Sequence, residues 1–120
     1  MDNKEFSQKL EKRTISFAIR IIKLSSSLPN SPEARVIRNQ VTKSASSVGA
    51  NYREANRAKS SKDFKYKIKI CEGEASETEY WLNIIEELNW GEEEELKRLI
   101  REASELLAIF TSISSKMNSK

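Results

Sequence analysis

Apolar residues recur at alternating steps of three and four along almost the whole chain, the spacing that places them on one face of an α-helix. The pattern predicts four helices of similar length, at about residues 4–27, 32–58, 61–89 and 92–117. The segments between them are short, so helices adjacent in the chain are expected to run antiparallel. We therefore predict an all-α fold, an antiparallel up-down-up-down four-helix bundle formed by residues 1–120 as a single domain.

The first and third predicted helices show how regular the apolar stripes are. In residues 4–27 the isoleucines at positions 15, 19 and 22 widen a stripe formed by Leu10, Thr14, Phe17, Ile21, Leu24 and Leu28. In residues 61–89 the stripe is formed by Phe64, Ile68, Cys71, Ala75, Thr78, Leu82, Ile85 and Leu88. Such stripes predict a core shared by all four helices.

Polar residues at the predicted helix ends support these boundaries. Ser31 can cap the second helix, with Pro32 at its first position, where a missing N–H is tolerated. Ser60 and Asp63 form a pattern like a capping box at the start of the third helix. Gly91 can adopt the left-handed conformation that ends that helix.

The composition excludes several kinds of enzyme. The chain has no His and a single Cys, so it cannot carry a Ser-His-Asp or Cys-His nucleophile, an intramolecular disulfide or a histidine metal site. We expect no catalytic residue, no metal and no cofactor. Cys71, at a core position, is typical of a buried thiol in a reducing compartment. The longest apolar run, at residues 106–110, is far too short to span a membrane, so we expect a cytoplasmic protein.

The net charge of +3 conceals an asymmetry along the chain. Residues 1–70 hold sixteen Lys and Arg against six Asp and Glu, whereas residues 71–120 hold five against twelve. The cations concentrate where the second and third helices are joined and extend along the second helix. A patch of this kind binds phosphate backbones through counterion release. The candidate nucleic-acid-binding residues are Arg35, Arg38, Lys43, Arg53, Arg57, Lys59, Lys62, Lys65 and Lys69.

Two other interpretations of these cations stay open, namely a solvated helical face and a docking surface for an acidic protein. Tyr52 and Tyr66 lie among the charges. No aromatic ladder of the single-strand type and no helix-turn-helix signature accompanies them, so base-specific readout is not indicated.

A row of small and polar residues follows the apolar stripe of the second helix: Gln40, Ser44, Ser47, Asn51 and Glu54. If the second and third helices turn near residue 60, this row lies across from Glu74 and Glu77, and Gly49 lies level with Gly73. We interpret the row as a close helix–helix approach or a subunit contact, with Arg13 as a further partner for the carboxylates. The alternatives are a row that faces water and a catalytic carboxylate pair. Trp81 is expected at the core edge or in a subunit interface.

Many of these positions together resemble a known family, the bacterial 23S rRNA intervening-sequence proteins. The resemblance runs from about residue 10 to residue 115. It is carried by Arg13-Thr14, Phe17-Ala18, Ile21-Ile22-x-Leu24, Leu28-Pro29, Gln40, Ser44-Ala45-x-Ser47-Val48-Gly49-Ala50-Asn51-Tyr52-x-Glu54-Ala55, Ser61-x-Asp63-Phe64, Lys67 and Glu74-Ala75-x-Glu77-Thr78-x-Tyr80-Trp81-Leu82.

The resemblance implies an antiparallel four-helix bundle that assembles as a ring-like homopentamer. It also implies a distant similarity to the accessory variability protein of diversity-generating retroelements, a basic pentamer that binds nucleic acid. The polar row then takes a structural and assembly role. We predict a non-enzymatic oligomeric scaffold that binds nucleic acid, structured RNA in preference to DNA, with no small-molecule substrate and no membrane partner. The alternative is an adaptor that docks an acidic or nucleic-acid-processing protein.

Overall fold

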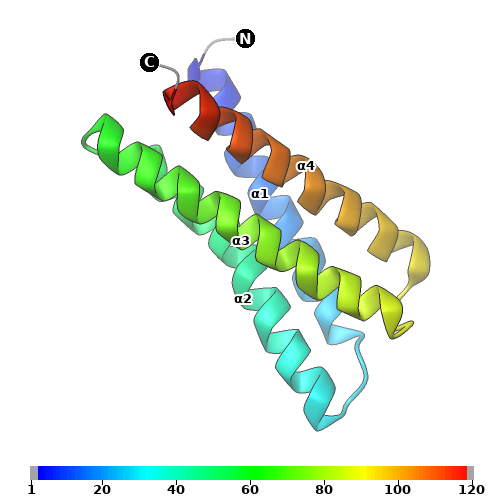
Figure 1. Cartoon of the computed structure of the whole chain (residues 1–120). Helices are drawn as coiled ribbons and strands as arrows, with labels where there is room; N and C mark the ends of the chain where they lie inside the picture. The colour runs from blue at the N-terminus through cyan, green and yellow to red at the C-terminus, as the bar shows by residue number, and fades with distance from the viewer. Residues whose placement is uncertain (1–2, 119–120) are drawn as a thin grey trace.

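Four long helices make up the computed structural model, which describes residues 3–118 (Figure 1). They are α1 (Asn3–Ser26), α2 (Pro32–Ala55), α3 (Ser61–Glu87) and α4 (Glu93–Asn118). Within the described residues there is no strand. The all-α four-helix bundle that the sequence predicts is confirmed. The start of α1, the end of α4 and the α2–α3 turn lie at one end of the bundle (Figure 1).

The capping residues act as expected, but two helices end earlier than predicted. Ser31 Oγ accepts from Ala34 N–H, and Ser60 Oγ accepts from Asp63 N–H, each at 3.1 Å. α2 ends at residue 55 rather than 58 because the amides of Arg57 and Ala58 bond three residues back, which tightens the chain into a turn. α3 ends at residue 87 rather than 89 because Asn89 adopts a left-handed φ of 59°. Gly91 is also left-handed, as predicted, with a φ of 81°.

The buried core follows the predicted stripes with two exceptions, the α1 isoleucines and Leu88 at the end of the α3 stripe, which is 48% exposed. Thr14, Phe17, Ile68, Cys71 and their equivalents on the other helices are almost fully excluded from solvent. The isoleucines at 15, 19 and 22 are different, since each remains about half exposed. They form a strip on the outer face of α1 and do not widen the core. Burial there would require a neighbouring helix on the outer side of α1, and within residues 3–118 no helix lies there.

Contacts along α2 and α3 run antiparallel, in the predicted register. Ser44 lies opposite Thr78, and Val48 lies opposite Cys71, whose thiol donates to the Val48 carbonyl at 3.4 Å. Gly49 and Gly73 therefore lie near the same level, as predicted, but the two glycines do not face each other. Gly49 faces α1, where a Cβ would come within 2.7 Å of Thr14 Oγ1, while a Cβ on Gly73 would meet nothing within 4 Å.

Charged side chains join α1 to α4, whose backbones approach each other least among the neighbouring pairs. Arg13 donates to both carboxylate oxygens of Glu102, at 2.6 and 2.7 Å, and to Glu105 at 2.9 Å. Arg20 forms a similar two-point contact with Glu95, at 3.0 and 3.1 Å. The expectation that Arg13 neutralises the carboxylates beside the polar row of α2 is therefore wrong, because α4 takes its guanidinium.

Candidate nucleic-acid interface

The turn between α2 and α3 is fixed by local hydrogen bonds on both sides. Asn56, which caps α2, donates a backbone bond to Tyr52 O at 3.1 Å, and its side chain donates to Glu11 Oε2 on α1 at 2.8 Å. Ser60 caps α3, and its backbone carbonyl accepts a hydrogen bond from the Phe64 amide. Tyr52 is buried just before the turn, and its ring lies 5.5 Å from that of Phe110. The cations around this turn are thus carried on an ordered backbone.

Six of the candidate cations surround this turn, and we call them the basic corner: Arg53, Arg57, Lys59, Lys62, Lys65 and Lys69. Arg57 and Lys59 lie on the turn itself, because α2 ends at residue 55. All members but the half-buried Lys65 are exposed. Within residues 3–118 only Lys69 has an ion pair, with Glu72 at 3.6 Å. The other five ammonium and guanidinium groups stay available to an anion.

The remaining three candidate cations do not belong to this corner. Arg35 lies near the start of α2, roughly 30 Å along the helix axis from Arg57 at 1.5 Å per residue. Arg38 donates to the carbonyls of Ser25, Leu28 and Pro29, at 3.0, 3.3 and 2.7 Å. Its guanidinium therefore closes the C-terminal end of α1, whose last carbonyls lack helical partners. Lys43 lies midway along α2, across from Glu74.

A shallow hollow of about 470 Å³ lies beside the basic corner. Its lining comes from the end of α2, the turn and the first turns of α3, namely Glu54, Arg57, Ala58, Lys59, Asp63, Tyr66 and Lys67. Glu54 and Lys67 form an ion pair at 3.1 Å across the two helices. Tyr66 is not among the residues predicted for this site, and its only sequence signal is an aromatic residue one helical turn from Lys62 and from Lys69.

The polar row of α2 is only partly a buried network. Ser44 is fully buried and accepts from Thr78 Oγ1 at 2.9 Å, while Thr78 also bonds to the Glu74 carbonyl. Gln40, Ser47 and Asn51 are half-buried, and the Asn51 amide bonds to the Ser47 carbonyl of its own helix at 2.8 Å. Glu54 is exposed. The buried part of the row is therefore the Ser44–Thr78 contact.

On α3, the residues predicted to lie beside this row, Glu74, Glu77 and Trp81, lie at the edge of the core. Burial, and then the negative charge of Glu77, raise the pKa of Glu74 above its usual value. Trp81 packs against the core and donates from its indole nitrogen to Glu77 Oε2 at 3.2 Å. Burial raises the pKa of Cys71 to about 12, so this thiol is an unreactive core group at neutral pH.

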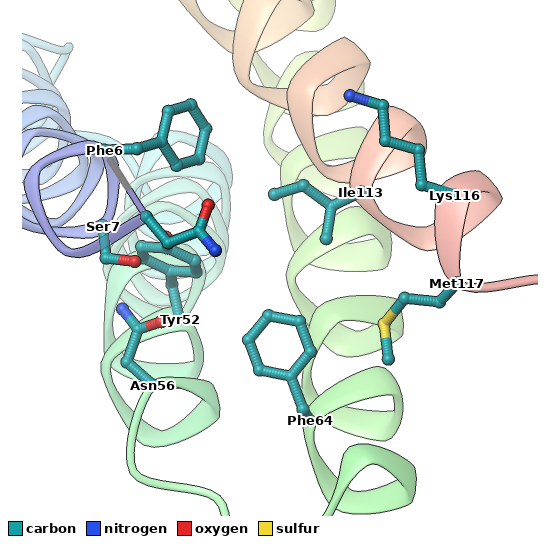
Figure 2. A pocket seen from close by; sticks show the side chains of 9 residues that line it. Phe6, Ser7, Tyr52, Asn56, Phe64, Ile113, Lys116 and Met117 are labelled. Carbon is teal, nitrogen blue, oxygen red and sulfur yellow. The ribbon is translucent and has the colours of Figure 1, made fainter. Parts of the chain in front are cut away.

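A larger cavity, of about 520 Å³, opens at the same end of the bundle (Figure 2). Phe6 of α1, Tyr52 of α2, Phe64 of α3 and Ile113 and Met117 of α4 surround it, so its wall is mainly apolar. In residues 3–118 no three His, Cys, Asp or Glu side chains gather as metal ligands. None of the described helices combines the length and apolar character needed to cross a bilayer.

The fold and the corner define a class: a small, histidine-free four-helix bundle with unpaired cations around one inter-helix turn. Over residues 7–112 the chain matches the 23S rRNA-intervening sequence protein family, and it belongs to that family. It is also similar to a solved protein of unknown function from the S23 ribosomal protein family of Bacteroides thetaiotaomicron VPI-5482. That pair shares 34% identity and a TM-score of 0.79, covering 87% of this chain and 96% of the other. No curated protein matches the chain.

Proposed function

We propose that this protein is a non-enzymatic cytoplasmic scaffold that binds nucleic acid, structured RNA in preference to DNA, through the basic corner. The observation that carries the proposal is the set of five cations around one ordered turn that have no ion pair within residues 3–118. Elsewhere on the chain many cations are already engaged, as Arg13, Arg20 and Arg38 are. Cations kept apart from carboxylates favour an external anion as their partner.

Phosphate backbones suit this arrangement because each neutralised phosphate releases condensed counterions. For duplex DNA the logarithm of the binding constant falls by about 0.9 per phosphate contact for each unit of log salt, and for single strands by about 0.7. Four or five contacts at one corner therefore give a binding constant that is strongly salt-dependent. Side chains on a turn reach outward from the bundle, so the helices need not enter a groove.

The test measures binding of the nuclease-treated protein to a structured RNA and to a duplex DNA across a salt series. A variant with Arg53, Arg57, Lys62 and Lys65 replaced by Gln is compared with a control that replaces four exposed cations outside the basic corner and the isoleucine strip, namely Lys9, Lys97, Arg98 and Arg101. We expect steep salt dependence for the native chain, a loss of at least 10-fold in the corner variant, and a small change in the control. An equal loss in both variants would show that only net charge matters.

A protein-only complex that survives nuclease treatment and high salt would favour the second function, an adaptor for an acidic protein. No observation on the described residues points to a particular protein of that kind. The same corner variant distinguishes the two functions. If the protein is an adaptor, the variant loses the protein partner, and the native chain already shows no RNA binding at low salt.

We further propose that copies of the chain assemble with one another, as a homopentamer on the family resemblance. Two exposed apolar strips support self-association. One is the isoleucine strip of α1, flanked by Lys12 and Lys23. The other lies on α3, where Tyr80 and Leu88 are exposed and Glu77 and Glu87 flank them. α1 and α3 lie diagonally in the bundle, so two unlike surfaces of opposite charge face different directions. A head-to-tail contact of this type can close into a ring.

Gly73 supports contact at the outer face of α3. A glycine inside a helix costs about 1 kcal/mol relative to Ala. Within residues 3–118 no atom lies within 4 Å of where a Cβ on Gly73 would be, so packing in this part of the chain does not require a glycine. Solution mass measurements test the assembly. Ile19→Glu is expected to reduce the mass to that of one chain, whereas Val36→Glu, at an equally exposed residue off the strip, is expected to leave it unchanged. A single-chain mass for the native protein would contradict the proposal.

A further inference from the structure

Tyr66 has an unusual position for a large aromatic side chain. It is 65% exposed, and within residues 3–118 neither its ring nor its hydroxyl has a partner among the polar and aromatic contacts. Tyr80, the other exposed tyrosine, is 58% exposed but packs edge-on against Trp81, with ring centroids 5.1 Å apart. The Tyr66 ring is thus accessible to an external flat group, and no polar or aromatic contact within residues 3–118 accounts for its position.

The surroundings of Tyr66 combine three chemical features. Arg57 and Lys59, both exposed and without an ion pair among the described residues, lie on the wall of the 470 Å³ hollow. Half-buried Ala58 lies between them and contributes an apolar surface. The hollow's volume is in the range of small-ligand sites. An aromatic wall, an apolar surface and two cations are the features that a nucleotide requires, with its flat base and its phosphate.

The carboxylates in the hollow do not prevent anion binding. Glu54 is already paired with Lys67 at 3.1 Å. Asp63 lies in the first turn of α3, where the unbonded backbone amides of the helix favour a negative charge. The cations that are left without a carboxylate partner are those on the turn, next to Tyr66.

We propose that this hollow binds one unpaired nucleotide of the RNA, with its base stacked on Tyr66 and its phosphate held by Arg57 and Lys59. The inference rests on the proposed function and adds a preference to it. A base inside a continuous duplex is stacked on its neighbours and cannot reach a side chain on the protein surface, whereas a bulged or loop base can. The corner therefore selects RNA that has an unpaired base next to a helical segment.

The experiment compares two RNA hairpins of equal charge whose loops are replaced by a polyethylene glycol linker, so that neither has an unpaired loop base. One stem is fully paired and the other carries a single bulged 2-aminopurine. Tyr66→Ala is expected to weaken binding of the bulged hairpin about 5- to 100-fold without changing its salt slope, since stacking releases no counterions. Tyr66→Phe should bind as the native chain does, because it keeps the ring. Val36→Ala, at an exposed apolar residue away from the corner and off the strips, is the control and should have no effect. The 2-aminopurine fluorescence reports stacking directly.

The outcomes separate this inference from the proposed function. If Tyr66→Ala binds the bulged hairpin as tightly as the native chain while Arg57→Gln/Lys59→Gln weakens it, the nucleotide site is wrong and the basic corner stands. Equal affinity of the native chain for the paired and bulged hairpins would also overturn the inference. If neither hairpin binds the native protein at low salt, the proposed function fails and the nucleotide site fails with it.

Discussion

Where α2 meets α3, small side chains allow close packing, and the polar groups that are buried there satisfy one another. Ser44 and Thr78 share a hydrogen bond, and the Cys71 thiol bonds to the Val48 carbonyl. Where α1 faces α4 the backbones stay apart, and arginine side chains cross the gap to glutamates. The α2–α3 contact therefore depends on the shape of the packed side chains, and the α1–α4 contact depends on their charge. Salt and acid should therefore weaken the α1–α4 contact and leave the α2–α3 contact almost unchanged.

Overpacking the α2–α3 contact should have the largest effect. Ser44→Leu places a bulky group where no space exists, and we expect a loss of about 3 kcal/mol in the free energy of unfolding. Denaturant unfolding measures it. Ser44→Ala, which removes the hydroxyl and adds no volume, should cost about 1 kcal/mol or less. A similar loss in both variants would show that the hydrogen bond, and not the shape, holds α2 to α3.

Removing Arg13 should have the next largest effect. The Glu102 side chain is only 17% exposed, so Arg13→Met leaves a partly buried carboxylate without its partner. We expect a loss of about 1–2 kcal/mol at low salt, between the values for exposed and buried pairs. Urea unfolding at 0.02 M and 1 M NaCl is the measurement, with a smaller loss at high salt. A loss that does not change with salt would indicate packing by the arginine stem.

Acid should weaken the second ion pair between α1 and α4. Hydrogen bonding from Arg20 holds the pKa of Glu95 below its usual value. Because the folded pKa is lower than the unfolded one, this stabilisation is present above the unfolded pKa and is lost as the pH falls through the folded pKa. Glu95→Gln should therefore lower the stability at pH 7, by up to about 1 kcal/mol for such an exposed pair. The difference in Tm from the native chain should vanish near pH 2.

The smallest effect should be a gain in stability, from a substitution on the α2–α3 side. Burial raises the pKa of Glu74, so its charged form slightly destabilises the folded chain, and this loss develops as the pH rises through the folded pKa. Glu74→Gln should raise Tm at pH 7 by about 1–2 °C, corresponding to a few tenths of a kcal/mol. At pH 3 the two proteins should melt together. A lower Tm at pH 7 would mean that attraction to Lys43 outweighs burial.

The parts of this fold that were predicted correctly are those that depend on near neighbours in the chain. Ser31 and Ser60 cap their helices because a hydroxyl two or three residues from an unbonded amide reaches it in any protein. The buried faces follow from periodicity alone. The grouping of cations at the basic corner follows for the same reason, since they are close in sequence. The bonds of Arg38 could not be predicted, because its carbonyl partners lie on another segment.

By itself, the sequence determined the four helices, the serine caps, most of the residues that are buried, and the concentration of cations at one turn. Tertiary structure decided the rest: that Gly49 faces Thr14, that Arg13 reaches α4, that the α1 isoleucines stay exposed, and that Tyr66 lines a hollow with Arg57. The physical reason is rotation. Periodicity gives the angular spacing of side chains around one helix. Which neighbouring helix each side chain faces is set only when all four helices pack together.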